Sequence, residues 1–87
     1  MDKFREMTSF VALVDAGSFV GAADAIGMSK AAVSRHVAEL EQRLGARLLH
    51  RTTRRLSLTD DGQLFYARAK QMLAAVDEAE SEISSRS

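Results

Sequence analysis

The stretch FVGAADAIGMSKAAVSRHVA, residues 19–38, decides the fold of this chain. Its first half has apolar or small side chains at the i, i+3, i+4, i+7 spacing of one helix face: Phe19, Ala22, Ala23 and Ile26. Gly27 then ends the helix, because a residue without a Cβ atom adopts a positive φ most easily. Ser29 is a natural N-cap for a second helix. The stretch therefore predicts two short helices joined by a tight turn.

The second helix has an apolar face with the same spacing: Val33, Val37, Leu40 and Leu44. Ala23 is small enough to let the two helices approach closely, and Val33 fills the angle between them. Together these features predict a helix-turn-helix, which inserts its second, recognition helix into the major groove of DNA. An ordinary helical hairpin within a larger fold is the alternative.

The segments on either side of this motif predict further elements. A first helix is expected from Asp2 to about Ala16. Residues 47–51 and 56–58 have the pattern of two short strands closed by a basic turn. Thr59 is expected to cap a last helix that continues to Ser84.

The expected fold is mainly α. It is a winged helix-turn-helix of three helices and a two-stranded β-wing over residues 1–59, followed by a long C-terminal linker helix over residues 60–87.

The last helix has an unbroken 3.5-residue apolar period, which is typical of a coiled coil. We name these positions the seam: Phe65, Ala69, Met72, Val76, Ala79 and Ile83. The period predicts a homodimer through this helix, with Leu64 and Leu73 off the seam and facing the core of their own domain. A plain amphipathic helix folded back on its own domain is the alternative.

Composition excludes several classes of protein. The 87 residues contain no cysteine and two histidines, so neither a disulfide framework nor a convincing metal site is expected. No apolar run approaches the ~20 residues of a membrane span, and the N-terminus lacks the apolar core of a signal peptide. These features predict a cytoplasmic protein without a metal or cofactor.

The formal net charge of zero conceals an asymmetry. Residues 30–55 contain seven basic and two acidic residues, whereas residues 71–87 contain four acidic residues and one arginine. Such a distribution favours a polyanion-binding centre and a tail with another purpose, against the alternative of a solvated basic face without a partner.

Nothing in the sequence resembles a catalytic constellation, so an enzyme is not expected. Asp60 and Asp61 directly follow Thr59, where carboxylates stabilise the start of a helix. Glu39 and Glu41 are expected to be structural, with Glu39 paired to both Arg35 and Arg43 at i, i+4 spacing.

The predicted recognition helix has the residues that DNA binding requires. Its start at Ser29 presents backbone N–H groups suited to a phosphate, and its exposed N-terminal half presents Lys30, Ala31, Ser34 and Arg35 to base edges. Arg35 could instead contact phosphate or pair with Glu39. The wing would place Arg54 and Arg55 in an adjacent minor groove, and its Thr52 and Thr53 against phosphates.

The order of these motifs resembles the N-terminal domain of LysR-type transcriptional regulators over about residues 4–83. The resemblance rests on five features in sequence: the Ala22–Ala23 pair, Ala32–Arg35, the run LEQRLG at 40–45, Leu48–Leu49 with Arg51, and Leu58–Thr59 before Gly62. It implies major-groove contacts from Lys30, Ala31, Ser34 and Arg35, a minor-groove contact from Arg54, and backbone contacts from Ser18 and Thr52. The family usually has Gln and then Pro where this chain has Lys30 and Ala31, which changes the expected base preference.

The resemblance also implies partners. Such regulators are bacterial, pair their linker helices antiparallel, and are commonly tetramers when complete. They bind a small-molecule inducer through a C-terminal effector domain, which this chain lacks, so a fragment or isolated domain is expected.

The first hypothesis for function is therefore sequence-specific binding of an interrupted palindrome in double-stranded DNA by a homodimer. The alternatives are a winged-helix module that binds an acidic protein, and an oligomerisation helix with an incidental basic patch.

Overall fold

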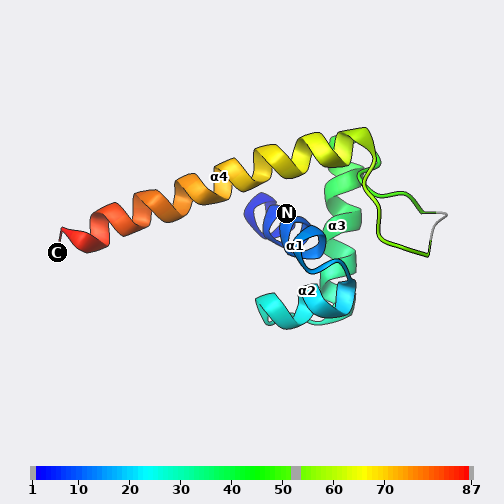
Figure 1. Cartoon of the computed structure of the whole chain (residues 1–87), viewed down its shortest axis with the longest axis horizontal. Coiled ribbons are helices and arrows are strands. Elements are labelled where there is room, and N and C mark those ends of the chain that lie inside the picture. The colour runs from blue at the N-terminus through cyan, green and yellow to red at the C-terminus, as the bar shows by residue number, and fades with distance from the viewer. Residues whose placement is uncertain (1, 52–53, 87) are drawn as a thin grey trace.

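The computed structural model describes residues 2–51 and 54–86, and this part of the chain forms four helices (Figure 1). Their bounds are α1 Lys3–Ala16, α2 Phe19–Ile26, α3 Lys30–Leu44 and α4 Asp60–Ser85. The first three helices pack together, and α4 crosses α1 before extending beyond the body. The molecule consequently measures 50 × 24 × 23 Å. Among the described helices, none is both long enough and apolar enough to cross a membrane.

The predicted helix starts are confirmed. In each of three N-caps, the side-chain oxygen accepts the amide N–H three residues later at 2.9–3.0 Å: Ser18, Ser29 and Thr59. Gly27 has a φ of 66° at the end of α2, so the turn between α2 and α3 forms at the residue that tolerates this backbone best. The helix-turn-helix is therefore present as predicted.

A single hydrophobic core joins α1, α2 and α3 with the segment that follows α3. Its buried members are Phe10, Leu13, Ala22, Ala23, Val33, Val37, Leu40, Leu48 and Leu49. Ala23 and Val33 are among them, as expected from their places beside the turn. The prediction for Leu44 is wrong: it is 41% exposed, because it ends α3 and the core at this end is filled by Leu48 instead.

The predicted two-stranded β-wing is wrong in its extent. In the described part of residues 47–58, only one antiparallel bridge forms, between Leu49 and Leu58. The amide of His50 donates to the carbonyl of Ser57 at 3.1 Å, and that of Thr59 to Leu48 at 3.0 Å. Pairing cannot continue past Thr59 because α4 begins directly at Asp60. We call residues 50–57 the wing loop; its Thr52 and Thr53 lie outside the described residues.

The first half of α4 packs against its own domain. Gly62 and Ala69 are buried, and the ring of Phe65 lies 5.9 Å from that of Phe10 between centroids. The predicted orientation of Leu64 towards the core is wrong, since it is 61% exposed. Leu73 is half-buried beside α1, as expected.

Gly62 marks the closest approach of α4 to the body. A Cβ atom at this position would overlap the backbone carbonyl of Leu48. Because both the helix and the Leu48 segment are held by backbone hydrogen bonds, neither can move away without losing contacts.

We therefore expect Gly62→Ala to lower the free energy of unfolding by about 1–3 kcal/mol, the usual cost of overpacking. Urea denaturation followed by circular dichroism would measure this loss. The neighbouring exposed residue provides a control, since Gln63→Ala should change stability by less than about 0.5 kcal/mol. Equal stability of both variants would contradict the close packing described here.

Candidate nucleic-acid interface

The N-terminal half of α3 is an exposed surface that carries the predicted recognition residues. Lys30, Ala31, Ser34 and Arg35 are all exposed. The hydroxyl of Ser29 accepts the Ala32 amide, so the amides of Lys30 and Ala31 lie ahead of it, where a helix has no internal acceptors. This end of α3 therefore combines side-chain donors with the positive end of a helix.

Arg35 forms a weak surface ion pair. Its Nε atom lies 3.5 Å from Oε1 of Glu39, and both side chains are largely exposed. An exposed pair of this kind is worth about 0–1 kcal/mol, so an approaching polyanion can replace the carboxylate. The predicted Arg35–Glu39 pair is confirmed and leaves the guanidinium available to a stronger partner.

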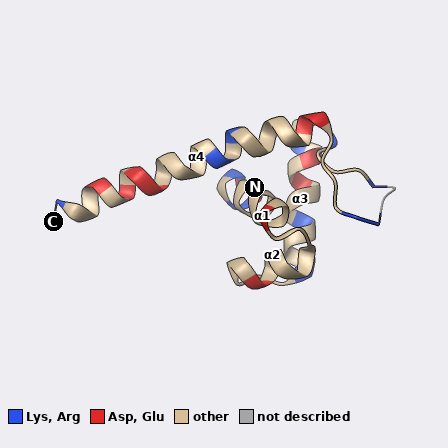
Figure 2. Ribbon diagram, in the orientation of Figure 1, with Lys and Arg blue, Asp and Glu red and all other residues tan. Residues whose placement is uncertain are grey.

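A groove connects this helix end to the wing loop. We call it the basic groove, and it has a volume of about 370 Å³. The residues used below are Ser18, which caps α2, Val20 of α2, Lys30 of α3, and His50, Arg51, Arg54 and Arg55 of the wing region. Basic residues colour both the wing loop and α3 in Figure 2, and acidic residues colour the first turn and the outer part of α4.

The structure thus brings together four of the predicted contact residues in one groove: Ser18, Lys30, Arg54 and Arg55. The others that are described, Ser29, Ala31, Ser34 and Arg35, lie on or at the start of α3. Thr52 lies outside the described residues. Sequence reasoning missed Val20 and His50, since neither a lone apolar residue nor a lone histidine signals a groove before the fold is known.

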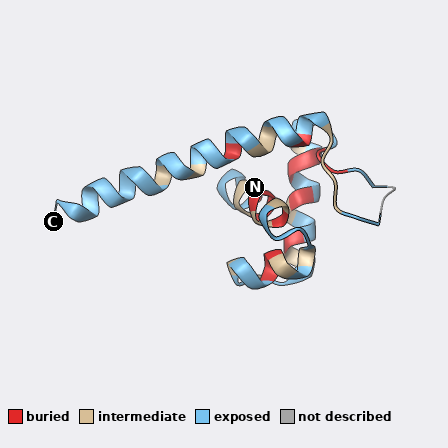
Figure 3. Ribbon diagram, in the orientation of Figure 1, coloured by how far each residue is buried: buried red, intermediate tan, exposed pale blue. Residues whose placement is uncertain are grey.

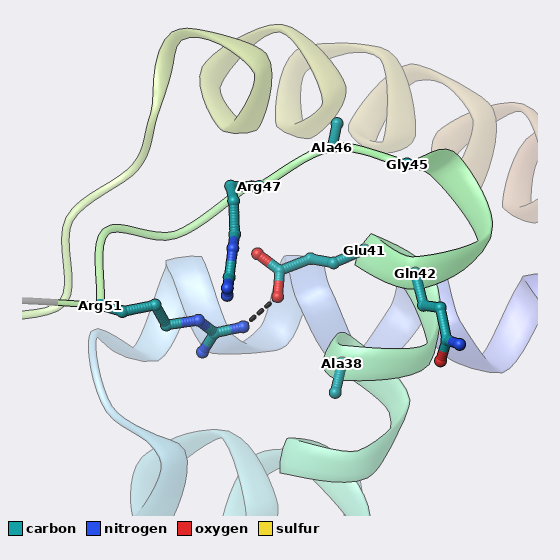
Figure 4. A pocket seen from close by; sticks show the side chains of 7 residues that line it. All are labelled: Ala38, Glu41, Gln42, Gly45, Ala46, Arg47 and Arg51. Carbon is teal, nitrogen blue, oxygen red and sulfur yellow. Dashed lines mark hydrogen bonds and ion pairs between the residues drawn. The ribbon is translucent and has the colours of Figure 1, made fainter.

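The wing loop is anchored to α3 by the carboxylate of Glu41 (Figure 4). This side chain is only 7% exposed, and its Oε2 atom accepts the amides of Leu48 at 2.7 Å and Leu49 at 3.2 Å. Its Oε1 atom accepts from the guanidinium of Arg51. The prediction of a structural role for Glu41 is confirmed.

Arg43 pairs with α1, and the prediction of a pair with Glu39 is wrong. The guanidinium donates twice to Oε1 of Glu6, at 2.7 Å and 3.0 Å. Glu6 is only 2% exposed, so its buried charge binds the guanidinium more strongly than the solvated Glu39 would. The pair fastens the C-terminal part of α3 to α1.

His36 also joins α3 to α1. Its Nδ1 atom lies 3.0 Å from the hydroxyl of Ser9, which is fully buried. In the described part of the chain, no group of His, Asp and Glu side chains is placed to hold a metal ion.

One protein-family model matches the three packed helices, the wing region and the start of α4. The profile described as "Bacterial regulatory helix-turn-helix protein, lysR family" matches residues 4–63.

Two curated relatives match nearly the whole chain. An HTH-type transcriptional repressor of Pseudomonas aeruginosa is 54% identical over 80 residues, which are 92% of this chain and 25% of the repressor. The HTH-type transcriptional regulator CrgA of Neisseria meningitidis is 47% identical over 79 residues, which are 91% of this chain and 26% of CrgA. The chain therefore spans about a quarter of the length of these relatives.

Solved structures agree with these matches. The DNA-binding domain of BenM in complex with catB site 1 DNA has a TM-score of 0.90 at 35% identity, covering 95% of this chain and 93% of that one. The structure of CrgA has a TM-score of 0.76 at 47% identity, covering 91% of this chain and 27% of CrgA.

The buried position of Glu41 leads to a prediction. Glu41→Gln keeps the shape of the side chain but removes the charge that Arg51 and the two amides share, so we expect a loss of about 1.5–3 kcal/mol in unfolding free energy. The matched change Glu39→Gln, on the same helix but in a surface pair, should cost less than about 1 kcal/mol. Urea titrations of both variants would measure the difference, and similar losses would rule out an anchoring role for Glu41.

Proposed function

The chain belongs to the lysR family of bacterial regulatory helix-turn-helix proteins, and we propose that it binds a specific sequence of double-stranded DNA as the DNA-binding domain of a transcription regulator. This family consists of transcriptional regulators and not of enzymes. One observation carries the proposal: the exposed residues of α3 continue into the basic groove, so a recognition helix and a cationic wing share one side of the fold. The likeness to a domain solved with DNA supports it.

In this proposal α3 lies in the major groove. Lys30 and Arg35 donate to O6 and N7 of guanine, Ser34 bonds either a donor or an acceptor, and the methyl group of Ala31 contacts thymine. On binding, the guanidinium group of Arg35 leaves the Glu39 carboxylate and contacts the DNA. The four exposed side chains occupy the N-terminal half of the helix, the part that reaches base edges in this motif.

The basic groove and the wing loop would hold the DNA backbone on either side of α3. Arg54 and Arg55 enter the neighbouring minor groove, where narrow A·T tracts concentrate negative potential. Ser18, Thr52 and the helix start at Ser29 bond phosphates and so fix the register of the protein on the duplex. The structure adds His50 and Val20 as candidates for contact with the backbone that crosses the basic groove.

We propose a homodimer through the outer part of α4. Phe65 and Ala69 already pack against the body of their own chain, so they contribute to a partner less than the 3.5-residue period suggests. The remaining seam residues are better placed: Met72 is 44% and Ile83 67% exposed, and Val76 and Ala79 lie between them. The predicted domain boundary at residue 59 is therefore a boundary of function and not of packing. The first part of α4 packs against its own domain, and its outer part would bind the partner.

A complete protein of this kind would be a tetramer in the bacterial cytoplasm, with an inducer bound by a separate effector domain. Such a dimer would read two half-sites of an interrupted palindrome, separated by about one helical turn or a multiple of it.

Selection from randomised duplexes tests the proposal. The bound fraction is sequenced at two salt concentrations, and a two-fold symmetric motif is expected. Binding that depends on salt but enriches no motif would leave only a non-specific basic surface. A protein that binds no duplex would refute DNA binding and favour an acidic protein as the partner.

Arg35→Ala should weaken binding to the selected sequence by about 5- to 150-fold, the value of one good base contact, and relax the preference at one base pair. Fluorescence anisotropy with single-base variants of the site would measure both effects. The control is Arg5→Ala on α1, which removes a similarly exposed arginine in a surface pair and should change affinity by less than about twofold. Uniform weakening across all sequences would make Arg35 a phosphate contact.

Ile83→Glu should produce monomers, because it places a charge in the apolar part of the seam, and it should weaken binding to paired half-sites by about 100-fold through lost bivalency. Ser81→Glu adds the same charge to another face of α4 and should leave the dimer intact. Sedimentation velocity distinguishes the two variants. An unchanged dimer in Ile83→Glu would contradict the placement of the interface.

A further inference from the structure

Three polar side chains connect α1 to the middle of α4. The hydroxyl of Tyr66 donates to Oδ1 of Asp15, and Nζ of Lys70 donates to Oδ2 of the same carboxylate at 3.3 Å. The ammonium group of Lys70 also lies 5.8 Å from the centroid of the Tyr66 ring. We call these three residues the clasp. Because each carboxylate oxygen has its own donor, the clasp constrains the orientation of α4 relative to α1 as well as the distance between the two helices.

The remaining attachments of α4 lie closer to its start or are non-directional. At its start, the hydroxyl of Thr59 donates to the carbonyl of Arg47 at 2.6 Å, and Gly62 abuts Leu48. Phe65 and Ala69 then pack against the body, but apolar contacts permit small tilts and rotations. From residue 77 to 86 every residue is exposed (Figure 3). In this arrangement the start of α4 is a pivot and the clasp sets the angle about it.

The free part of α4 magnifies any change of that angle. From its start at Asp60 to Ser85 the helix extends about 38 Å, at ~1.5 Å per residue. A tilt of about 5° about this pivot would move the far end by about 3 Å, whereas neighbouring base pairs are ~3.4 Å apart. A small tilt therefore corresponds to about one base pair along DNA.

We propose that the clasp is a positioning device that determines which spacing between half-sites the dimer accepts. The inference rests on the proposed function, since it requires two copies joined through α4. Asp15 then acts on specificity without touching DNA: it orients α4, and the paired α4 helices set the separation of the two recognition helices.

The protonation states of the donors suit this role. The hydrogen bond to Asp15 raises the pKa of the Tyr66 hydroxyl, and the same carboxylate raises the pKa of the Lys70 ammonium group. Both groups therefore remain protonated below their ordinary pKa values, and the stabilisation that they give the clasp is fully present there. This stabilisation is lost only as the pH rises above about 10, through the raised pKa values.

The first test compares Asp15→Asn and Tyr66→Phe with the native chain on duplexes whose half-sites are moved apart one base pair at a time. We expect the native dimer to prefer one spacing, and both variants to lose about fivefold of that preference while binding a single half-site with unchanged affinity. The control is Gln71→Ala, an exposed neighbour on α4 outside the clasp, which should keep the native spacing profile. A native profile in Asp15→Asn would overturn the inference.

The second test is independent of DNA. The chain contains no cysteine, so Asp24→Cys on α2 and Glu80→Cys on α4 provide two unique sites for spin labels, both exposed. Labelled chain diluted with unlabelled chain reports the distance within one copy, and Asp15→Asn should broaden its distribution. An equally narrow distribution would overturn the inference. Failure of the native chain to bind paired half-sites, with broadening still observed, would refute the proposed function and leave the clasp as the element that orients α4.

Discussion

The course of the chain between α3 and α4 depends on one buried carboxylate, that of Glu41. An ionised group in the core is costly unless it is surrounded by donors, and here two consecutive amides and a guanidinium supply them. These amides belong to Leu48 and Leu49, whose side chains close the hydrophobic core. The same interaction therefore satisfies the charge, completes the core and directs the wing loop towards the N-terminal end of α3. Leu49 then pairs with Leu58, which brings the chain back to begin α4.

Two more polar contacts give the small body its rigidity. The Glu6–Arg43 pair and the Ser9–His36 hydrogen bond both join α1 to α3, at positions on either side of the buried Leu40. The recognition surface is consequently presented by a helix whose opposite face is held at several points. Base recognition requires such support, because an exposed lysine or arginine discriminates between bases only when its backbone is fixed.

The neutral overall charge is divided between the parts of the molecule in a way that suits DNA binding. Cations lie on α3 and the wing loop, whereas the acidic residues of α4 lie in its first turn and in its outer part (Figure 2). In the proposed complex, a duplex at the basic groove would meet the cations of α3 and the wing loop, and the acidic outer part of α4 would lie away from the phosphates. The shape adds to this separation, since α4 projects from the body for much of its length.

Local patterns in the sequence were sufficient to predict the four helices, their caps at Ser18, Ser29 and Thr59, and the exposed residues of α3. Each of these features depends on neighbours within about four residues, so a linear sequence contains the information. The carboxylate of Glu41 was assigned a structural role, but its partners could not be identified, because Leu48 and Leu49 approach it only after the chain has turned at Gly45. The Arg43 pair was misassigned for the same reason: the nearby Glu39 matched the helical spacing, whereas the buried Glu6 is 37 residues away.

The faces of α4 show where periodicity alone is insufficient. A 3.5-residue repeat identifies an apolar stripe but not the surface that covers it, and the tertiary structure divides that stripe between the body at Phe65 and Ala69 and the exposed positions beyond. Leu44 is exposed although its spacing favoured burial, because Leu48 fills the core at that end of α3. Leu64 is exposed although it was expected to face the core of its own domain, because Gly62 sets the rotation of α4. The sequence by itself determined the four helices, their caps and the exposed side chains of α3. Tertiary packing decided which long-range partners neutralise the buried charges and at what angle α4 leaves the body, since both depend on contacts between residues far apart in the chain.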